Sequence, residues 1–132
     1  MPMKHCALLL AFISLTGCSS PVAPQSHAEI ADVSLIRLLA SPDRYEGKLV
    51  RVSGFVRLQF EGNAIYLHQE DFQHHLTSNG LWLGDVKCVG RGGKDVKSGY
   101  AIVEGKFTAT SRGHMNLWSG ELSDVQRCVE LP

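Results

Sequence analysis

The sequence has no excess of charge of either sign, because 13 lysines and arginines balance 13 aspartates and glutamates. Domains that bind nucleic acid usually carry a clearly basic surface, so we expect no nucleic-acid partner. The sequence also lacks an apolar run of the roughly 20 residues that a membrane-spanning helix needs. Hydrophobic residues nevertheless make up 44% of the 132-residue chain, an ordinary share for one folded domain.

Motifs of the common hydrolases and redox enzymes are missing as well. The chain contains no Gly-x-Ser-x-Gly, no His-Glu-x-x-His and no Cys-x-x-Cys. Glu70 and Asp71 are adjacent, so their carboxylates would point apart instead of forming an acid–base pair. We therefore predict a protein without enzymatic activity or cofactor, which acts by binding or scaffolding.

The first 17 residues have the features of an export signal. A basic start precedes an apolar segment, Cys6–Leu15, that is too short to span a membrane. The sequence Leu15-Thr16-Gly17-Cys18 follows where this segment ends. It resembles the lipobox of bacterial lipoproteins. The alternative interpretation is an ordinary secretory signal followed by a chance cysteine.

This resemblance implies cleavage before Cys18 and acylation of that residue, so that residues 1–17 are removed. Several acyl chains, at ~0.8 kcal/mol per buried methylene, would hold the chain on the membrane permanently. Ser19 follows the cysteine instead of aspartate, which in this family favours the outer membrane, with the domain facing the periplasm. Residues 18–31, rich in small, polar and proline residues, would form a tether of at most ~45 Å.

Two cysteines remain after the export segment. Cys88 and Cys128 would lie in an oxidising compartment, where a pair of cysteines commonly forms a disulfide. The alternative is two unpaired, half-buried cysteines in different elements, because the sequence does not give their separation in space. A disulfide would close a loop of about 40 residues and contribute about 3–4 kcal/mol in the chain-entropy model.

Strand-like alternation organises residues 32–132, which we interpret as one domain. The segment Lys48–Phe60 is the clearest case, with apolar residues expected to face inward. These residues are Val50, Val52, Val56, Leu58 and Phe60. Gly54 shares their face and would let a long strand bend, as a small closed barrel requires.

Four more strands are expected, at residues 64–68, 81–83, 100–109 and 115–129. The alternation of the last one breaks near Ser123 and Asp124, which predicts a bulge. A helix is expected at Asp32–Ser41, because Pro42 resists further helix.

The stretches between the later strands are polar or rich in glycine. Residues 69–78 are expected to hold a short helical turn that Asn79 and Gly80 close like a helix C-cap. Residues 84–99 are expected to be a glycine-rich loop.

Together these elements predict a mainly β fold, a small five-stranded barrel with one N-terminal helix. The pattern resembles the OB-fold over residues 45–129. OB-folds commonly place a helix between the third and fourth strands, where this chain has the glycine-rich stretch, so the N-terminal helix would plug the barrel instead. The pattern Tyr-x-Gly-Lys-x-Val-x-Val-x-Gly at residues 45–54, with a later Gly113-His114, is also similar to small bacterial envelope proteins. That resemblance implies no activity.

The first candidate site is the outer face of the long strand. Phe55 is expected to face outward between Arg51 and Arg57. Tyr66 would join it from the next strand. Such a face would suit an oligosaccharide or an envelope protein as partner. The alternative is that Phe55 packs beneath a helix or a loop.

The second candidate is a metal site made of histidines. His68, His74 and His75 lie within ten residues, and His114 would approach from another loop. Imidazole is a good ligand for zinc, copper or nickel, although this spacing matches no established metal motif. The alternative is a polar loop with solvated histidines.

Two further hypotheses stay open. The basic, glycine-rich segment Lys87–Lys97 would form either a nest for anionic lipid or sugar groups or a solvated connection. A small inhibitor or immunity-type lipoprotein is the remaining class, although the chain carries no inhibitor motif.

Overall fold

The structure is a computed structural model that describes Met1 and residues 29–132. The expected export signal, Cys18 with its expected acylation, and most of the expected tether lie outside the described residues. Within the described part of the chain, no helix has the length and hydrophobicity to span a bilayer.

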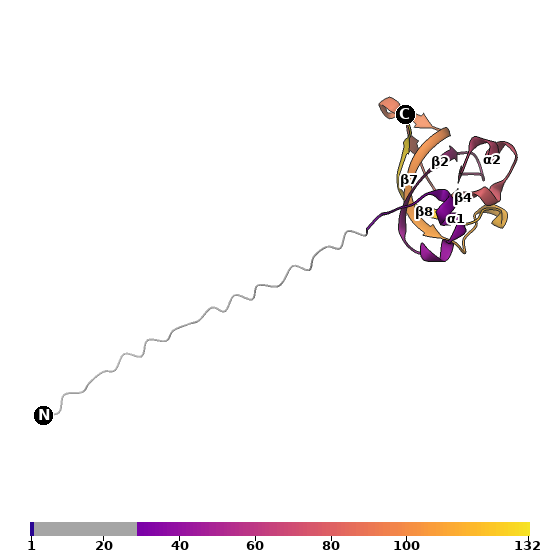
Figure 1. Cartoon of the computed structure of the whole chain (residues 1–132). Helices are drawn as coiled ribbons and strands as arrows, with labels where there is room; N and C mark the ends of the chain where they lie inside the picture. The colour runs from indigo at the N-terminus through magenta and orange to yellow at the C-terminus, as the bar shows by residue number, and fades with distance from the viewer. Residues whose placement is uncertain (2–28) are drawn as a thin grey trace.

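Five strands form a closed barrel. They are β2 (Leu49–Arg57), β3 (Ala64–Tyr66), β4 (Gly80–Leu83), β7 (Ser98–Thr108) and β8 (Glu121–Glu130). The order around the barrel is β2-β3-β4-β8-β7 and back to β2, and long β7 curves between its two neighbours (Figure 1). All neighbours are antiparallel except β4 and β8. This is an OB-like barrel, and the predicted mainly β, five-stranded fold is confirmed.

Alternation along β2 builds the core much as predicted. Val50, Val52 and Val56 are fully or almost fully buried. Gly54 lies among them, and a Cβ atom added there would come within 2.7 Å of the Leu35 side chain. A close approach of the N-terminal helix therefore requires glycine at this position.

The N-terminal helix α1 (Leu35–Ala40) closes onto the barrel core. Its N-cap is Ser34, whose hydroxyl accepts a hydrogen bond from the Arg37 backbone N–H at 3.3 Å. Leu35 and Leu38 are 2% and 0% exposed and belong to the barrel core. The helix is shorter than the predicted Asp32–Ser41, because β1 (Ala31–Asp32) instead pairs in parallel with β2.

A second short helix, α2 (Gln69–Gln73), lies between β3 and β4. A capping box starts it, with the His68 backbone N–H donating to the Asp71 carboxylate at 2.9 Å. A turn of 3-10 helix, η2 (Thr77–Asn79), follows. Gly80 is the C-cap of this turn, as predicted, and its backbone N–H donates to the Thr77 carbonyl; its conformation is extended, and it begins β4.

The stretch predicted as a loop contains a small hairpin. Its strands are β5 (Cys88–Val89) and β6 (Asp95–Val96), joined through η3 (Arg91–Gly93) beside the C-terminus (Figure 1). Cys88 and Cys128 form a disulfide with their Cα atoms 4.5 Å apart, which ties β5 to β8. Both cysteines are buried in the core.

The last strand begins later than predicted, because residues 114–116 form η4 (His114–Asn116), a short turn, instead. The predicted bulge is confirmed. The register between β7 and β8 shifts between Glu104 and Lys106, opposite Ser123 to Arg127. Asp124 takes a positive φ of 47° in this interval.

Candidate functional site

The structure buries the aromatic residue of the predicted sheet-face site. Phe55 is 4% exposed, so the predicted open patch is wrong, and the alternative, that Phe55 packs beneath a helix or a loop, is confirmed. Helix α2 covers the outer side of β2 and places the Phe72 ring 6.2 Å from the Phe55 ring. Tyr100 lies against Phe55 on the other side at 5.6 Å. We call Phe55, Tyr66, Phe72 and Tyr100 the aromatic face.

Tyr66 and Arg57 are parts of this aromatic face. Tyr66 is 4% exposed and packs 5.9 Å from Phe72. Burial raises the pKa of its hydroxyl, and an interaction with the Trp118 side chain lowers it in part. Arg57 lies over the Phe72 ring at 5.2 Å from its centroid. The arginine therefore packs on a covered aromatic cluster instead of flanking an open one.

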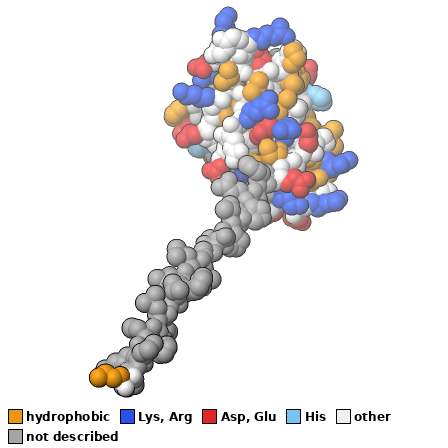
Figure 2. Space-filling model, turned by 90° about the vertical axis from the view of Figure 1, so that its left-hand side faces the viewer, with side chains coloured by type: hydrophobic (Ala, Val, Ile, Leu, Met, Phe, Trp, Pro, Cys, Tyr) orange, Lys and Arg blue, Asp and Glu red, His pale blue; other side chains and the backbone are white. Residues whose placement is uncertain are grey.

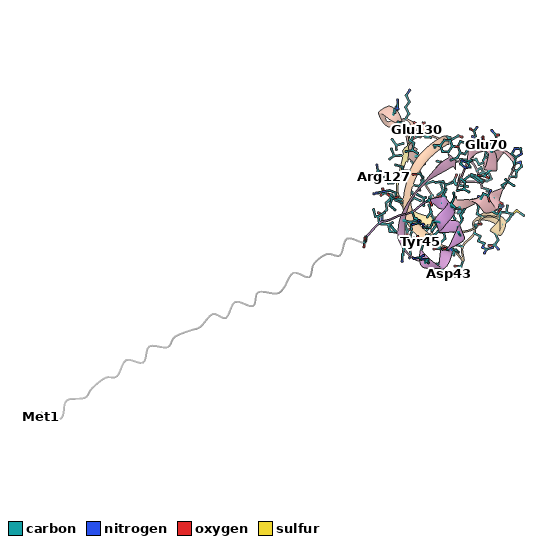
Figure 3. All side chains as sticks on the ribbon, viewed as in Figure 1. Met1, Asp43, Tyr45, Glu70, Arg127 and Glu130 are labelled. Atoms are coloured by element: carbon teal, nitrogen blue, oxygen red, sulfur yellow. A yellow bond between two sulfur atoms is a disulfide. The ribbon has the colours of Figure 1, made fainter. Side chains whose placement is uncertain are left out.

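Arg51 belongs to a separate cluster of charges. Its Nε donates to the Glu104 carboxylate at 2.7 Å, and Arg127 donates to the same oxygen at 3.1 Å. Asp32 lies 3.7 Å from the other side of the Arg51 guanidinium. Arg127 and Glu70, at the start of α2, lie on opposite sides of the domain (Figure 3).

The pKa values reflect this cluster. The hydrogen bond from Arg51 lowers the pKa of the Glu104 carboxyl, against an opposing effect of burial, and Glu104 in turn raises the pKa of Arg51. Glu104 is 6% exposed. A buried carboxylate between two arginines stabilises the barrel wall, and it leaves Arg51 engaged within the protein.

The histidines do not converge. Among the residues that the structure describes, no three side chains of the metal-ligating types come together, so the predicted joint site is wrong. His68 caps the start of α2, and His74 stands at its end. His75 takes a left-handed backbone with a φ of 57°. His114 lies on another loop, 3.9 Å from the Glu61 carboxylate.

The basic segment 87–97 does not form a single-sign surface. Figure 2 shows lysines and arginines interspersed with acidic side chains over the face it displays. Asp95 lies in β6 itself, and the Glu130 carboxylate lies against Gly90 of the hairpin turn. The acidic neighbours reduce the positive potential that an anion nest would need.

Exposed apolar side chains gather on two loops at one end of the barrel. Phe60 is 90% exposed on the β2–β3 loop, whereas the sequence predicted it to face inward. Met115 is 76% and Leu117 48% exposed on the β7–β8 loop. The two loops meet, because His114 Nε2 and Glu61 Oε2 are 3.9 Å apart. We call Phe60, Met115 and Leu117 the loop surface.

The β2–β3 loop is a tight turn. Asn63 Oδ1 accepts a hydrogen bond from the Gln59 backbone N–H at 3.0 Å, and the Gly62 N–H donates to the Gln59 carbonyl at 3.2 Å. Glu61 takes a positive φ of 53°. Phe60 is therefore at the tip of a turn that begins after β2 has ended at Arg57.

The β7–β8 loop is held by two tryptophans. Gly113, with a φ of 65°, lies directly on Trp82, where an added Cβ would come within 2.6 Å of the Trp82 Cβ. Trp82 meets Trp118 edge to face with ring centroids 4.9 Å apart. The Trp118 backbone N–H donates to the Arg112 carbonyl at 3.2 Å. Aromatic packing thus fixes the base of the loop below its exposed apolar tip.

The backbone of both loops is strained. Five non-glycine residues in the described part of the chain have positive φ, and Glu61, Met115 and Asn116 are three of them. A left-handed conformation costs roughly 1–2 kcal/mol for an ordinary L-residue. Such strain concentrates at binding and catalytic sites, where the surrounding structure maintains it.

One buried polar group lies beneath the β7–β8 loop. The indole Nε1 of Trp118 has no hydrogen-bond partner, and within the described ranges it is the one buried side-chain nitrogen or oxygen in this state. Its contact with Tyr66 therefore does not have the geometry of a hydrogen bond. The loop conformation is kept despite the cost of this unsatisfied donor.

Sequence reasoning missed the loop surface, although signals for it were present. Phe60 directly precedes the turn sequence Glu61-Gly62-Asn63, which places it at a loop tip rather than inside a strand. Met115 and Leu117 stand among Gly113, His114 and Asn116, residue types that favour turns over a buried strand.

Comparison of the chain with protein-family models, with curated proteins and with solved structures gave no match. Function is therefore inferred from the residues of this chain alone. Their arrangement exposes three large apolar side chains, Phe60, Met115 and Leu117, on two loops.

Proposed function

We propose that this protein is a lipid-anchored binding module of the bacterial outer membrane, without enzymatic activity, that binds its partner in the periplasm. The exposure of Phe60, Met115 and Leu117 on two contacting loops is the observation that carries the proposal. Large apolar side chains that are exposed together mark interaction sites in soluble domains. The strained backbone of the same loops supports this interpretation.

The position of the loops in the barrel also supports binding. The β2–β3 and β7–β8 loops connect the first with the second and the fourth with the fifth strand of the barrel. OB-fold proteins use these two loops, together with the adjoining sheet face, to bind ligands. Here α2 covers Phe55 and Tyr66 of the sheet face, Tyr100 stays 43% exposed, and the loops carry the most exposed apolar side chains.

Support for the anchor comes from the sequence. The lipobox-like Leu15-Thr16-Gly17-Cys18 ends the apolar segment, and Ser19 follows it. In Figure 1 the described chain enters the domain on the left, whereas the golden loop at η4 lies on the right. In this view the η4 part of the loop surface lies across the domain from the point where the described chain begins.

Acylation can be tested by growing cells with an alkyne-labelled palmitate and detecting the labelled protein in membrane fractions. We expect the wild-type protein to carry the label in the outer membrane and Cys18→Ala to lose it. Cys6→Ala is the matched control, because the resemblance places Cys6 in the removed segment, and it should keep the label. Label on Cys18→Ala would contradict the anchor.

Binding can be tested with a photoreactive amino acid placed at position 60 or 117 in intact cells. We expect a crosslinked species at both positions after irradiation. The control position is Ile36, which is 67% exposed on α1 and lies outside the loop surface. Irradiation that yields no adduct at position 60 or 117 would contradict a binding role for these loops.

A further inference from the structure

The hairpin of β5 and β6 has little backbone pairing with the barrel apart from its disulfide. Strand β5 has one register pair with β8, between Val89 and Val129. Val96 of β6 belongs to the core, and the Leu58 backbone N–H donates to the Lys97 carbonyl at 2.8 Å just after β6 ends. The disulfide is therefore the strongest connection between this hairpin and the barrel wall.

The turn of the hairpin packs against no other part of the domain. Residues 91–95 are exposed. Gly92 and Gly93 have φ values of 69° and 77°, and a Cβ atom added to either one would meet nothing within 4 Å. Figure 1 shows this turn projecting from the barrel beside the C-terminus. An unpacked, glycine-rich turn adds little stability of its own, so the position of the hairpin depends on the contacts at its base.

The closed barrel does not depend on the hairpin for its strand pairing. Strand β8 has seven register pairs with β7 and two with β4. In the described part of the chain, β5 and β6 lie outside this ring and pair with β8 and with each other. Departure of the hairpin would therefore remove Cys88 and Val96 from the core and leave the five barrel strands paired.

We propose that the disulfide is a redox-sensitive latch: its reduction releases the hairpin, residues 88–97, while the barrel stays folded. Cys88 and Cys128 are 1% and 4% exposed, so a reductant reaches the bond only when the hairpin has moved away from β8. Thiol–disulfide exchange then competes with closure of the hairpin, and once the bond is broken the remaining contacts no longer hold the hairpin in place.

A dithiol is the class of reductant that completes this reaction. One thiolate of the dithiol attacks a cysteine sulfur and breaks the disulfide, which leaves the other cysteine as a thiolate that takes up a proton. The second thiol of the reductant then displaces the first cysteine from the mixed disulfide. The protein gains two electrons and two protons and ends with two thiols, and the reductant ends as an internal disulfide.

Two exposed Arg-Gly bonds allow a matched test by limited trypsin digestion of the full chain. Arg91-Gly92 lies in the hairpin, and Arg112-Gly113 lies in the β7–β8 loop, which Figure 1 places apart from the hairpin. A protease binds an extended segment, so cleavage follows the population of the released hairpin and not the exposure of the arginine alone.

The oxidised protein is compared with protein that has been reduced with dithiothreitol without denaturant, alkylated with iodoacetamide and freed of reagents. Mass spectrometry follows cleavage at each bond. We expect reduction to speed cleavage after Arg91 at least about tenfold and to change cleavage after Arg112 by less than about twofold. The double variant Cys88→Ala/Cys128→Ala, which carries no alkyl groups, should behave like the reduced protein.

Tryptophan fluorescence separates release of the hairpin from unfolding of the whole domain. Trp82 and Trp118 pack edge to face in the barrel and its β7–β8 loop, so their emission should stay the same after reduction. Altered emission together with faster cleavage at both bonds would overturn the latch, because the disulfide would then hold the whole domain. Unchanged cleavage after Arg91 in the reduced protein would overturn it too, as would a disulfide that dithiothreitol reduces only in denaturant.

Discussion

Phe55 and Phe60 stand five positions apart in one stretch of sequence, and their environments are the reverse of those that the predicted binding patch required. Phe55, expected either in that patch or beneath a helix or loop, is 4% exposed, and Phe60, expected in the core, is 90% exposed. The aromatic face around Phe55 is covered by α2 through Phe72. The loop surface around Phe60 has no such cover among the described residues.

Two different physical effects produce this exchange. Strand β2 ends at Arg57, so an alternation of period two has no meaning at Phe60, which lies in the following turn. Phe55 does point to the outer side of the sheet, but a tertiary contact with a later helix decides its burial. The direction of a side chain relative to the sheet is a local property of the strand. Its exposure depends on which other elements pack over it.

The largest expected effect comes from truncating the two phenylalanines in turn. Phe55→Ala should lower the free energy of unfolding by about 3–5 kcal/mol, because it leaves a cavity beneath α2. Phe60→Ala should change it by less than about 0.5 kcal/mol, because the side chain is in solvent. Urea denaturation of both variants measures the difference. Equal losses would mean that the two regions do not differ in burial.

A second pair of variants tests whether Trp82 holds the loop surface in place. Gly113→Ala adds a Cβ against Trp82 at a residue of positive φ, and it should cost about 2–3 kcal/mol. Gly92 in the hairpin turn has a similar φ of 69° and no atom within 4 Å of an added Cβ. Gly92→Ala should therefore cost only about 1 kcal/mol, the backbone part alone. Equal denaturation midpoints for Gly113→Ala and Gly92→Ala would show that the contact with Trp82 adds no cost.

A smaller effect, which depends on pH, distinguishes the buried Glu104 from Glu61 on the exposed loop. The folded-state pKa of Glu104 is lowered, so its contribution to stability is fully present above the unfolded-state pKa of ~4.3. The contribution is lost as the pH falls through the lower pKa of the folded state. Glu104→Gln should be less stable than wild type at neutral pH and should lose less stability on acidification.

Thermal unfolding at several pH values measures this dependence. Glu61→Gln, on the exposed β2–β3 loop, is the control and should unfold like the wild type at neutral pH. A Glu104→Gln variant as stable as the wild type at neutral pH would contradict the role assigned to the Arg51–Glu104–Arg127 cluster.

The smallest effect concerns Met115 and should have opposite signs in stability and in binding. Met115→Gly relieves a left-handed backbone and should raise the free energy of unfolding by about 0.5 kcal/mol, because glycine adopts this conformation freely. The same substitution removes an apolar contact, so it should also lower the yield of the photocrosslinked adduct. Met115→Ala keeps the strain and isolates the side-chain loss. A destabilised Met115→Gly would show that the strain is not relieved.

The fold was largely predictable because its strands carry local signals. Alternation marks Val50, Val52 and Val56, and the broken pattern near Ser123 and Asp124 marks the bulge. Each of these features depends on the direction of side chains along one strand. The hairpin of β5 and β6 was not predictable in this way, because two-residue strands are too short to show a period.

The candidate site was less predictable, because it depends on contacts between distant segments. The meeting of Glu61 with His114 joins loops about 50 residues apart, and no single-sequence pattern reports such a contact. The cover over Phe55 likewise comes from Phe72, beyond the next strand. For Cys88 and Cys128 the sequence left two alternatives, a disulfide or two unpaired cysteines, and the structure shows the disulfide.

The short strand β1 also determines how the domain would respond to mechanical load. It joins β2 through two register pairs, Ala31 with Val50 and Asp32 with Arg51, just before α1 inserts into the core. A pull on the N-terminal end would load these two pairs first and leave the closed barrel intact. Release of residues 31–32 would lengthen the reach of the domain by ~7 Å, whereas Val33 belongs to the core. In the proposed lipid-anchored protein, the junction would thus act as a short extensible coupling between the anchor and the domain.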